Sequence, residues 1–167
     1  MRFPFTFLFA VLVLGGRGGP ARAQGPGPAL TLIGDSGRTR TLTSAELGAL
    51  PQVEVREVDK DSSRIVFRGP TIRDLMTLVG APAGHALRGP SMLLVVIAES
   101  SDGYKVAYAL SELDEQFGAR IAILAFTQND GPLPASEGPL RVVVAGEQHH
   151  ARWTRQVVRL RLVRAGS

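Results

Sequence analysis

Three histidines and no cysteine limit the metal chemistry that this sequence can support. His149 and His150 are adjacent, whereas His85 stands alone. Neighbouring residues of a strand point to opposite faces, so the adjacent pair could not readily share a metal there. In a loop the pair could bind a metal together with Glu147, although a solvated polar loop is the simpler interpretation. Because zinc sites need several closely spaced Cys or His ligands, we predict no metal site.

The sequence also contains no recognisable set of residues for nucleophilic catalysis. The Gly-x-Ser-x-Gly pattern, which exposes a nucleophilic serine on a sharp turn, does not occur. Ser100 and Ser101 precede Asp102 in a turn-like segment, where hydroxyl groups usually bond to the backbone. Hydrolytic chemistry therefore has no support, and we predict no catalytic residue.

The first 23 residues predict a secretory signal peptide. Arg2 precedes an apolar run at Phe3–Leu14, and Ala21-Arg22-Ala23 forms a small-x-small cleavage site before Gln24. The run is shorter than the roughly 20 apolar residues of a membrane span, although an uncleaved anchor is the alternative. We expect an exported protein, periplasmic or secreted, that is not inserted in the membrane after the leader is removed.

Charge and size argue for one near-neutral domain. The chain has 19 basic and 15 acidic side chains, and the leader removes Arg2, Arg17 and Arg22, which leaves 16 against 15. A nucleic-acid partner would predict a concentrated basic surface, so we expect none. We assign 24–28 to a flexible lead-in and 29–167 to a single domain, which must be stabilised by packing because no disulfide can form.

The expected elements are short strands with a few short helices, which predicts a single mixed-sheet α+β domain with peripheral helices. Alternating apolar residues and β-branched runs predict strands at 29–33, 53–58, 65–67, 92–98, 104–108, 119–126, 140–145 and 157–163. Helical spacing and candidate caps predict helices at 44–50 and 71–79, with a helical turn at 111–117. The segment 128–137 is expected to be a Gly/Pro loop.

The last expected strand carries arginines between its apolar residues. Arg159 and Arg161 alternate with Val and Leu, and Arg152, Arg155 and Arg164 lie nearby. One interpretation is that these arginines form a basic stripe that binds nucleic acid or a membrane. We favour an edge strand whose outward arginines discourage aggregation, because Trp153 is the only aromatic residue among them.

Three segments in a fixed order resemble the sulfite-oxidase-type molybdopterin-binding domain. They are Phe67–Leu75, Ser101–Val106, and the stretch from Asn129–Pro134 through Gly138–Val144 to Trp153. The resemblance covers roughly 30–163 and implies the mixed-sheet fold of that family. In the family a cysteine thiolate holds molybdenum. Here the corresponding stretch, 53–67, has acidic residues and serines but no cysteine, so we do not expect a molybdenum centre.

Small exported relatives without the cysteine bind free pterins, and they act as periplasmic sensors that control membrane-bound enzymes of cyclic-di-GMP metabolism. The resemblance therefore implies a pterin ligand and a partner in the periplasmic domain of a membrane signalling protein. A pterin is a flat heteroaromatic molecule with donors and an acceptor on its edge. It needs an aromatic face, a carboxylate for the donors, and a cation or backbone N–H for the carbonyl.

The ligand-binding candidates are Trp153, Arg141, Asp102, Tyr104, Glu137, Tyr108 and His149. Trp153 would stack on the ligand or simply pack in the core, and replacing it with alanine should abolish binding while leaving the fold intact. Asp102 or Glu137 would accept from the ligand, or else form turns. Arg141 would face solvent or pair with a carboxylate or the ligand.

Tyr104 and Tyr108 share a strand face, and they would line the pocket or fill the sheet. Two other functions remain open for the whole protein. One is a molybdopterin-dependent oxidoreductase subunit with a non-cysteine ligand, and the other is a ligand-free protein-interaction module.

Overall fold

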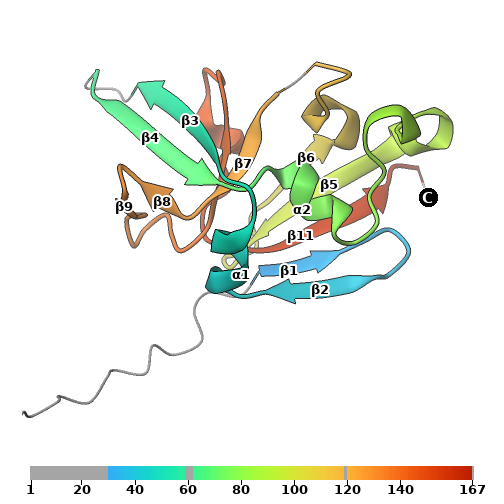
Figure 1. Ribbon diagram of the computed structural model, residues 1–167, viewed down its shortest axis with the longest axis horizontal. Coiled ribbons are helices and arrows are strands. Elements are labelled where there is room, and N and C mark those ends of the chain that lie inside the picture. The colour runs from blue at the N-terminus through green and yellow to red at the C-terminus, as the bar shows by residue number, and fades with distance from the viewer. Residues whose placement is uncertain (1–29, 59–61, 119, 167) are drawn as a thin grey trace, which may run out of the picture.

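The computed structural model describes residues 30–58, 62–118 and 120–166, which form three β-sheets and several short helices (Figure 1). The predicted signal peptide at 1–23 and lead-in at 24–28 lie outside the described residues. None of the helices in the described ranges is long and apolar enough to cross a membrane.

The strands are β1 (Leu30–Ile33), β2 (Thr39–Leu42), β3 (Val53–Val58), β4 (Arg64–Gly69), β5 (Leu94–Ser100), β6 (Lys105–Ala109), β7 (Ala122–Ala125), β8 (Thr127–Gln128), β9 (Gly131–Pro132), β10 (Arg141–Val144) and β11 (Val157–Arg164). The α-helices are α1 (Ser44–Ala49) and α2 (Ile72–Thr77). The 3-10 helices are η1 (Gly84–Ala86), η2 (Gly89–Leu93), η3 (Leu110–Leu113) and η4 (His150–Arg152). These mixed sheets with few short helices confirm the predicted α+β class.

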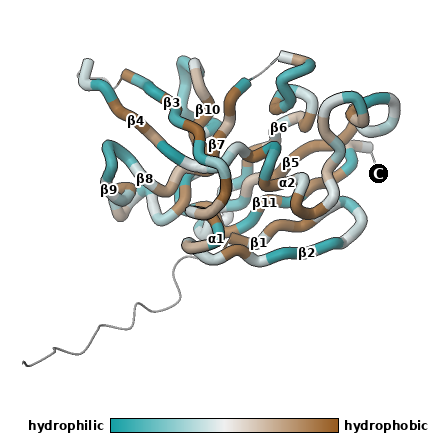
Figure 2. Tube along the Cα trace, viewed as in Figure 1, coloured by the Kyte–Doolittle hydropathy of each residue, from teal (hydrophilic) through white to brown (hydrophobic). Residues whose placement is uncertain are grey.

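The largest sheet has the strand order β2-β1-β11-β5-β6. β1 pairs with β11 in parallel, and the other neighbours are antiparallel. Alternate residues on its inner face are fully buried, including Leu32, Val96 and Leu160. Leu75 and Met76 of α2 are equally buried in the same core. Figure 2 shows the contrast along the sheet, with hydrophobic β1 and β5 and a largely hydrophilic outer strand, β2.

The remaining strands form a four-stranded sheet, β3-β4-β8-β9, and a two-stranded pair, β10-β7. β4 passes close to β7, where the Leu124 N–H donates to the Pro70 carbonyl at 2.9 Å. Gly69 permits this approach, because an added Cβ would lie only 2.0 Å from the Leu124 carbonyl oxygen. A side chain at this position would therefore force the two sheets apart.

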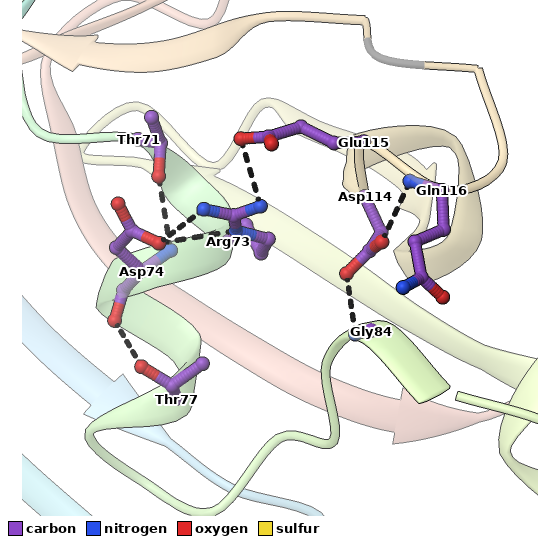
Figure 3. A network of polar contacts seen from close by, with 8 residues as sticks. All are labelled: Thr71, Arg73, Asp74, Thr77, Gly84, Asp114, Glu115 and Gln116. Atoms are coloured by element: carbon purple, nitrogen blue, oxygen red, sulfur yellow. Dashed lines mark hydrogen bonds and ion pairs between the residues drawn. The ribbon is translucent and has the colours of Figure 1, made fainter. Parts of the chain in front are cut away.

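A network of polar contacts joins α2, η1 and the segment that follows η3. The Thr71 hydroxyl accepts from the Asp74 N–H at the start of α2, and the Arg73 guanidinium bridges Asp74 and Glu115 at 2.9 and 3.0 Å (Figure 3). Asp114 is almost fully buried and accepts from the Gly84 N–H at 2.8 Å. This backbone N–H, more than any other contact, lowers the pKa of the Asp114 carboxyl. Each carboxylate in this network has a donor, as buried polar groups require.

The interpretation of the last strand as an edge strand is wrong. β11 lies at the centre of the largest sheet, between β1 and β5. Its arginines pair with a buried carboxylate of β5 instead of guarding an edge: Glu99 lies 2.9 Å from Arg159 and 3.3 Å from Arg161. One face of a central strand can remain polar when the sheet is packed on its other face only.

The other element predictions differ mainly at their ends. Of the two candidate caps for α1, Thr43 and Ser44, the structure selects Thr43, in a reciprocal pair with Glu46. The strand expected from residue 92 begins at Leu94, because η2 occupies the preceding residues. The helical turn expected at 111–117 is η3, which ends at Leu113, and the expected Gly/Pro loop contains the short strands β8 and β9.

Candidate functional site

A cleft of 280 Å³ lies between the four-stranded sheet and the segment that joins β10 to β11. We call it the Trp153 cleft, and its lining includes Phe67, Gln128, Glu137, Arg141, His150 and Trp153. A second cavity of 450 Å³, the Asp102 pocket, shares Arg141, His150 and Trp153 with it and adds Ser100, Asp102, Tyr104 and Arg155. The shared residues make this region one continuous candidate binding surface.

Trp153 forms the wall between the two cavities. Its side chain is 4% exposed and belongs to the hydrophobic core. The His150 ring stacks on the indole with centroids 3.8 Å apart and an interplanar angle of 12°, while Phe67 meets it edge-on at 5.7 Å. Trp153 therefore packs in the core, which was one of the two predicted alternatives, and it also lines both cavities. Because Trp153 is buried, its replacement by alanine should also destabilise the fold, contrary to our sequence-based expectation.

Arg141 takes the pairing alternative that the sequence left open. It lies on β10, is 9% exposed, and forms an ion pair with Glu137. Its guanidinium carbon also lies 5.0 Å from the Trp153 ring centroid and 5.7 Å from that of Phe67, within the range of cation–π attraction. An acid, a base and two aromatic rings, Glu137, Arg141, Phe67 and Trp153, are thereby held at one wall of the cleft.

Asp102 and Tyr104 line the neighbouring Asp102 pocket. The Asp102 carboxylate accepts from the Tyr104 N–H at 2.9 Å, and this bond is the main reason that the pKa of Asp102 is lowered. The Tyr104 hydroxyl donates to the Ala151 carbonyl at 2.8 Å. Asp102 therefore shapes its turn as the simpler alternative predicted, while its side chain still faces the cavity.

Tyr108 contacts the candidate site from within the hydrophobic core. It is fully buried, its hydroxyl donates to the Arg152 carbonyl, and it lines neither cavity. Burial raises the pKa of its phenol above the ordinary value. Tyr104 and Tyr108 thus hold successive carbonyls of η4, the 3-10 helix that carries His150.

His149 lies apart, at a neighbouring 660 Å³ depression that Glu57 and Glu147 also line. Glu147 is committed to arginine, since it lies 3.0 Å from Arg152 and 3.7 Å from Arg120. The described residues contain no group of three or more His, Cys, Asp or Glu placed to hold a metal. A metal site built from Glu147 and the two histidines therefore has no support.

His150 and Gln128 are among the cleft residues that were not ligand candidates in the sequence. His150 was considered only for metal binding, yet it stacks on Trp153. Gln128 lies in a segment expected to be a loop, and it reaches the cleft because β8 pairs with β4. No local pattern marks either role, since both depend on contacts between distant parts of the chain.

The comparisons agree with this architecture. The family model of the oxidoreductase molybdopterin binding domain matches residues 55–167, which is more than half of the chain. The chain therefore belongs to this family, whose fold is the sulfite-oxidase type that the sequence motifs resemble. No curated protein matches the chain.

A solved structure supports the fold independently. The sulfane dehydrogenase SoxCD from Paracoccus pantotrophus is similar, with a TM-score of 0.62 and 16% sequence identity. The similarity covers 81% of this chain but only 38% of that chain, so this protein spans less than half of its structural neighbour.

A thiolate-ligated molybdenum centre does not fit the donors present. The sequence has no cysteine, and molybdenum in this fold needs a soft thiolate ligand. In β3 and β4, where the family motif would place that ligand, the carboxylate of Glu57 instead accepts from the Gly146 N–H at 3.0 Å. Ser62 has a left-handed backbone with φ 66°. We therefore derive no chemical step through molybdenum.

Proposed function

We propose that this protein binds a pterin-like small molecule in the Trp153 cleft, without a molybdenum centre. The observation that carries the proposal is the combination of aromatic rings, a carboxylate and a guanidinium on one wall of a cleft. Phe67 and Trp153 provide apolar surface, while Glu137 and Arg141 provide opposite charges. A flat heterocycle with polar edges suits such a lining.

We further propose that the protein is an exported sensor. The leader-like N-terminus would direct it to the periplasm, and the missing cysteine resembles the subset of relatives that binds free pterins. Its partner would be the periplasmic domain of a membrane-bound enzyme of cyclic-di-GMP metabolism. The ligand would act by stabilising one arrangement of η4, because this segment lines both cavities and lies at the surface.

Titration of the exported protein with reduced and oxidised pterins tests the proposal. The fluorescence of Trp153 would follow binding, because it is the only tryptophan, with calorimetry as an independent check. We expect saturable one-to-one binding. A stably folded protein that binds neither form would refute the pterin proposal and favour a protein-interaction module.

Family membership also supports a second candidate, an oxidoreductase subunit with an unusual metal ligand. It predicts molybdenum and molybdopterin in stoichiometric amounts in protein isolated from its native export pathway. Elemental analysis of that protein decides between the two candidates, since the proposed sensor would contain no molybdenum.

A further inference from the structure

Two buried polar atoms of uncharged side chains at the Trp153 cleft lack hydrogen-bond partners among the described residues. One is the indole donor, Nε1 of Trp153, and the other is an amide acceptor, Oε1 of Gln128. Both residues line the cleft, and the Trp153 side chain is 4% exposed. Leaving a buried polar group unsatisfied costs about 1–3 kcal/mol, so such atoms at the wall of a cavity indicate a partner from outside the chain.

The carboxylates nearby already have partners within the chain. Glu137 is held by Arg141, and Asp102 of the adjoining pocket accepts from the Tyr104 N–H. These carboxylates are the ones the sequence suggested for the donor edge of the ligand. In contrast to these carboxylates, Trp153 Nε1 and Gln128 Oε1 have no hydrogen-bond partner within the described residues and can still bond to a ligand.

We infer that Gln128 and Trp153 form the specificity pair for a lactam edge, in which a ring N–H donates to Gln128 Oε1 while the adjacent carbonyl accepts from Trp153 Nε1. The inference rests on the proposed function and refines it, because it names the ligand group that this cleft selects. A lactam edge offers a donor and an acceptor side by side, and the pyrimidinone ring of a pterin carries one.

The stacking of His150 supports recognition at the edge of the indole. An indole N–H donates in the plane of its ring, so a hydrogen bond to Nε1 does not require displacement of the imidazole, which lies 3.8 Å from the ring centroid on the face of Trp153. Stacking on that face would instead displace His150. The structure therefore favours Trp153 as a hydrogen-bond donor over its predicted role as a stacking platform.

A pair of ligands separates these roles. 2-Amino-4-oxopteridine carries the lactam, whereas 2,4-diaminopteridine replaces its carbonyl with an amine and its ring N–H with a bare nitrogen. By calorimetry we expect the lactam ligand to bind the wild-type protein about tenfold or more tightly, because the diamino ligand sets a donor against the indole N–H. Equal affinities would overturn the inference while leaving the proposed function standing. Failure of both ligands to bind would refute the proposed function itself.

Variants then assign the preference to the two residues. Trp153→Phe keeps an aromatic ring but removes the donor, and Gln128→Met keeps the side-chain length but removes the amide. We expect each to reduce the lactam preference to about threefold or less, since one matched contact is gone. Gln116→Met makes the same change at an exposed glutamine outside both cavities and should retain the full preference. Thermal unfolding confirms that each variant is folded.

Two results would contradict the assignment. If Asp102→Asn removed the preference while Gln128→Met retained it, the lactam would lie in the Asp102 pocket. A second measurement needs no variant: the indole N–H signal of the single tryptophan should shift strongly downfield in nuclear magnetic resonance spectra with the lactam ligand only. An unchanged signal at saturation would show that Trp153 Nε1 makes no such bond.

Discussion

The five-stranded sheet and the Trp153 cleft treat buried polar groups differently. In the sheet, the residue Glu99 is 6% exposed, and its carboxylate has two arginine partners, Arg159 and Arg161. At the cleft, Trp153 Nε1 and Gln128 Oε1 are buried without a partner among the described residues. Since buried polar groups in stable proteins are nearly always paired, the difference separates a region whose polar groups are paired within the chain from the region that we propose as the ligand site.

The largest expected effect tests the sheet. Leu160→Ala in β11 should lower the free energy of unfolding by about 2–5 kcal/mol, because it opens a cavity on the central strand. Val158→Ala on the same strand is the matched control, and it should cost far less since that side chain is 41% exposed. Chemical denaturation measures both. Similar losses for the two variants would contradict the central, one-sided packing of β11.

The hydroxyl of Tyr108 links the sheet to the cleft. Tyr108→Phe should cost about 0.5–1.5 kcal/mol, because it removes the buried hydroxyl donor from the Arg152 carbonyl, which keeps its bond from the Thr154 N–H. Ligand affinity should fall as well, since η4 carries His150. Tyr104→Phe removes a comparable bond from a side chain that is half exposed, so its effect on denaturation should be smaller. The reverse order would show that η4 is held mainly from the surface.

Loss of an ion pair should cost more free energy of unfolding at the cleft, where the arginine is buried, than in the sheet, where the arginine side chains are more exposed. Glu137→Gln should cost about 1–3 kcal/mol, because the side chain of Arg141, taken by itself, is only 11% exposed and would lose its charged partner. Glu99→Gln should cost about 0–1 kcal/mol, since Arg159 and Arg161 are 45% and 42% exposed and can be solvated. Denaturation in low and high salt would compare them. A larger loss at Glu99 would reverse the comparison.

The smallest expected effect concerns acid. The folded-state pKa of Asp114 is lowered from 3.8, so the folded protein binds the proton less readily than the unfolded chain. This contribution to stability is present above pH 3.8 and declines as the pH falls through the lower folded pKa. Asp114→Asn should therefore unfold with a weaker dependence on pH below pH 3.8. An unchanged slope would assign acid sensitivity to other carboxylates.

Local pattern was sufficient to predict most strands but not their order. Alternating Val53 and Val55 marked β3, and the Asp102-Gly103 turn marked the β5–β6 hairpin. The central place of β11 depends on its parallel pairing with β1, whose residue Thr31 lies opposite Arg159. When a strand is considered alone, arginines suggest that it lies at the edge of a sheet. Arg159 and Arg161 fit a central strand because both pair with Glu99 of the neighbouring strand.

The candidate site was predictable in part for the same reason. Trp153, Arg141 and Glu137 belong to one stretch of sequence with a family resemblance, and the structure places all three at the cleft. Gln128 enters through β8, a strand of two residues with no periodicity to detect. The stack of His150 on Trp153 is a tertiary contact. Residue type alone could not reveal which polar atoms would lack partners.

The central strand of the largest sheet, β11, is also the last strand among the described residues. During synthesis, the β1–β2 and β5–β6 hairpins leave the ribosome first, and each can form alone because its partners are local. They can join only when β11 arrives and inserts between β1 and β5. The largest sheet of a nascent chain thus stays in two separate parts until β11 has been synthesised.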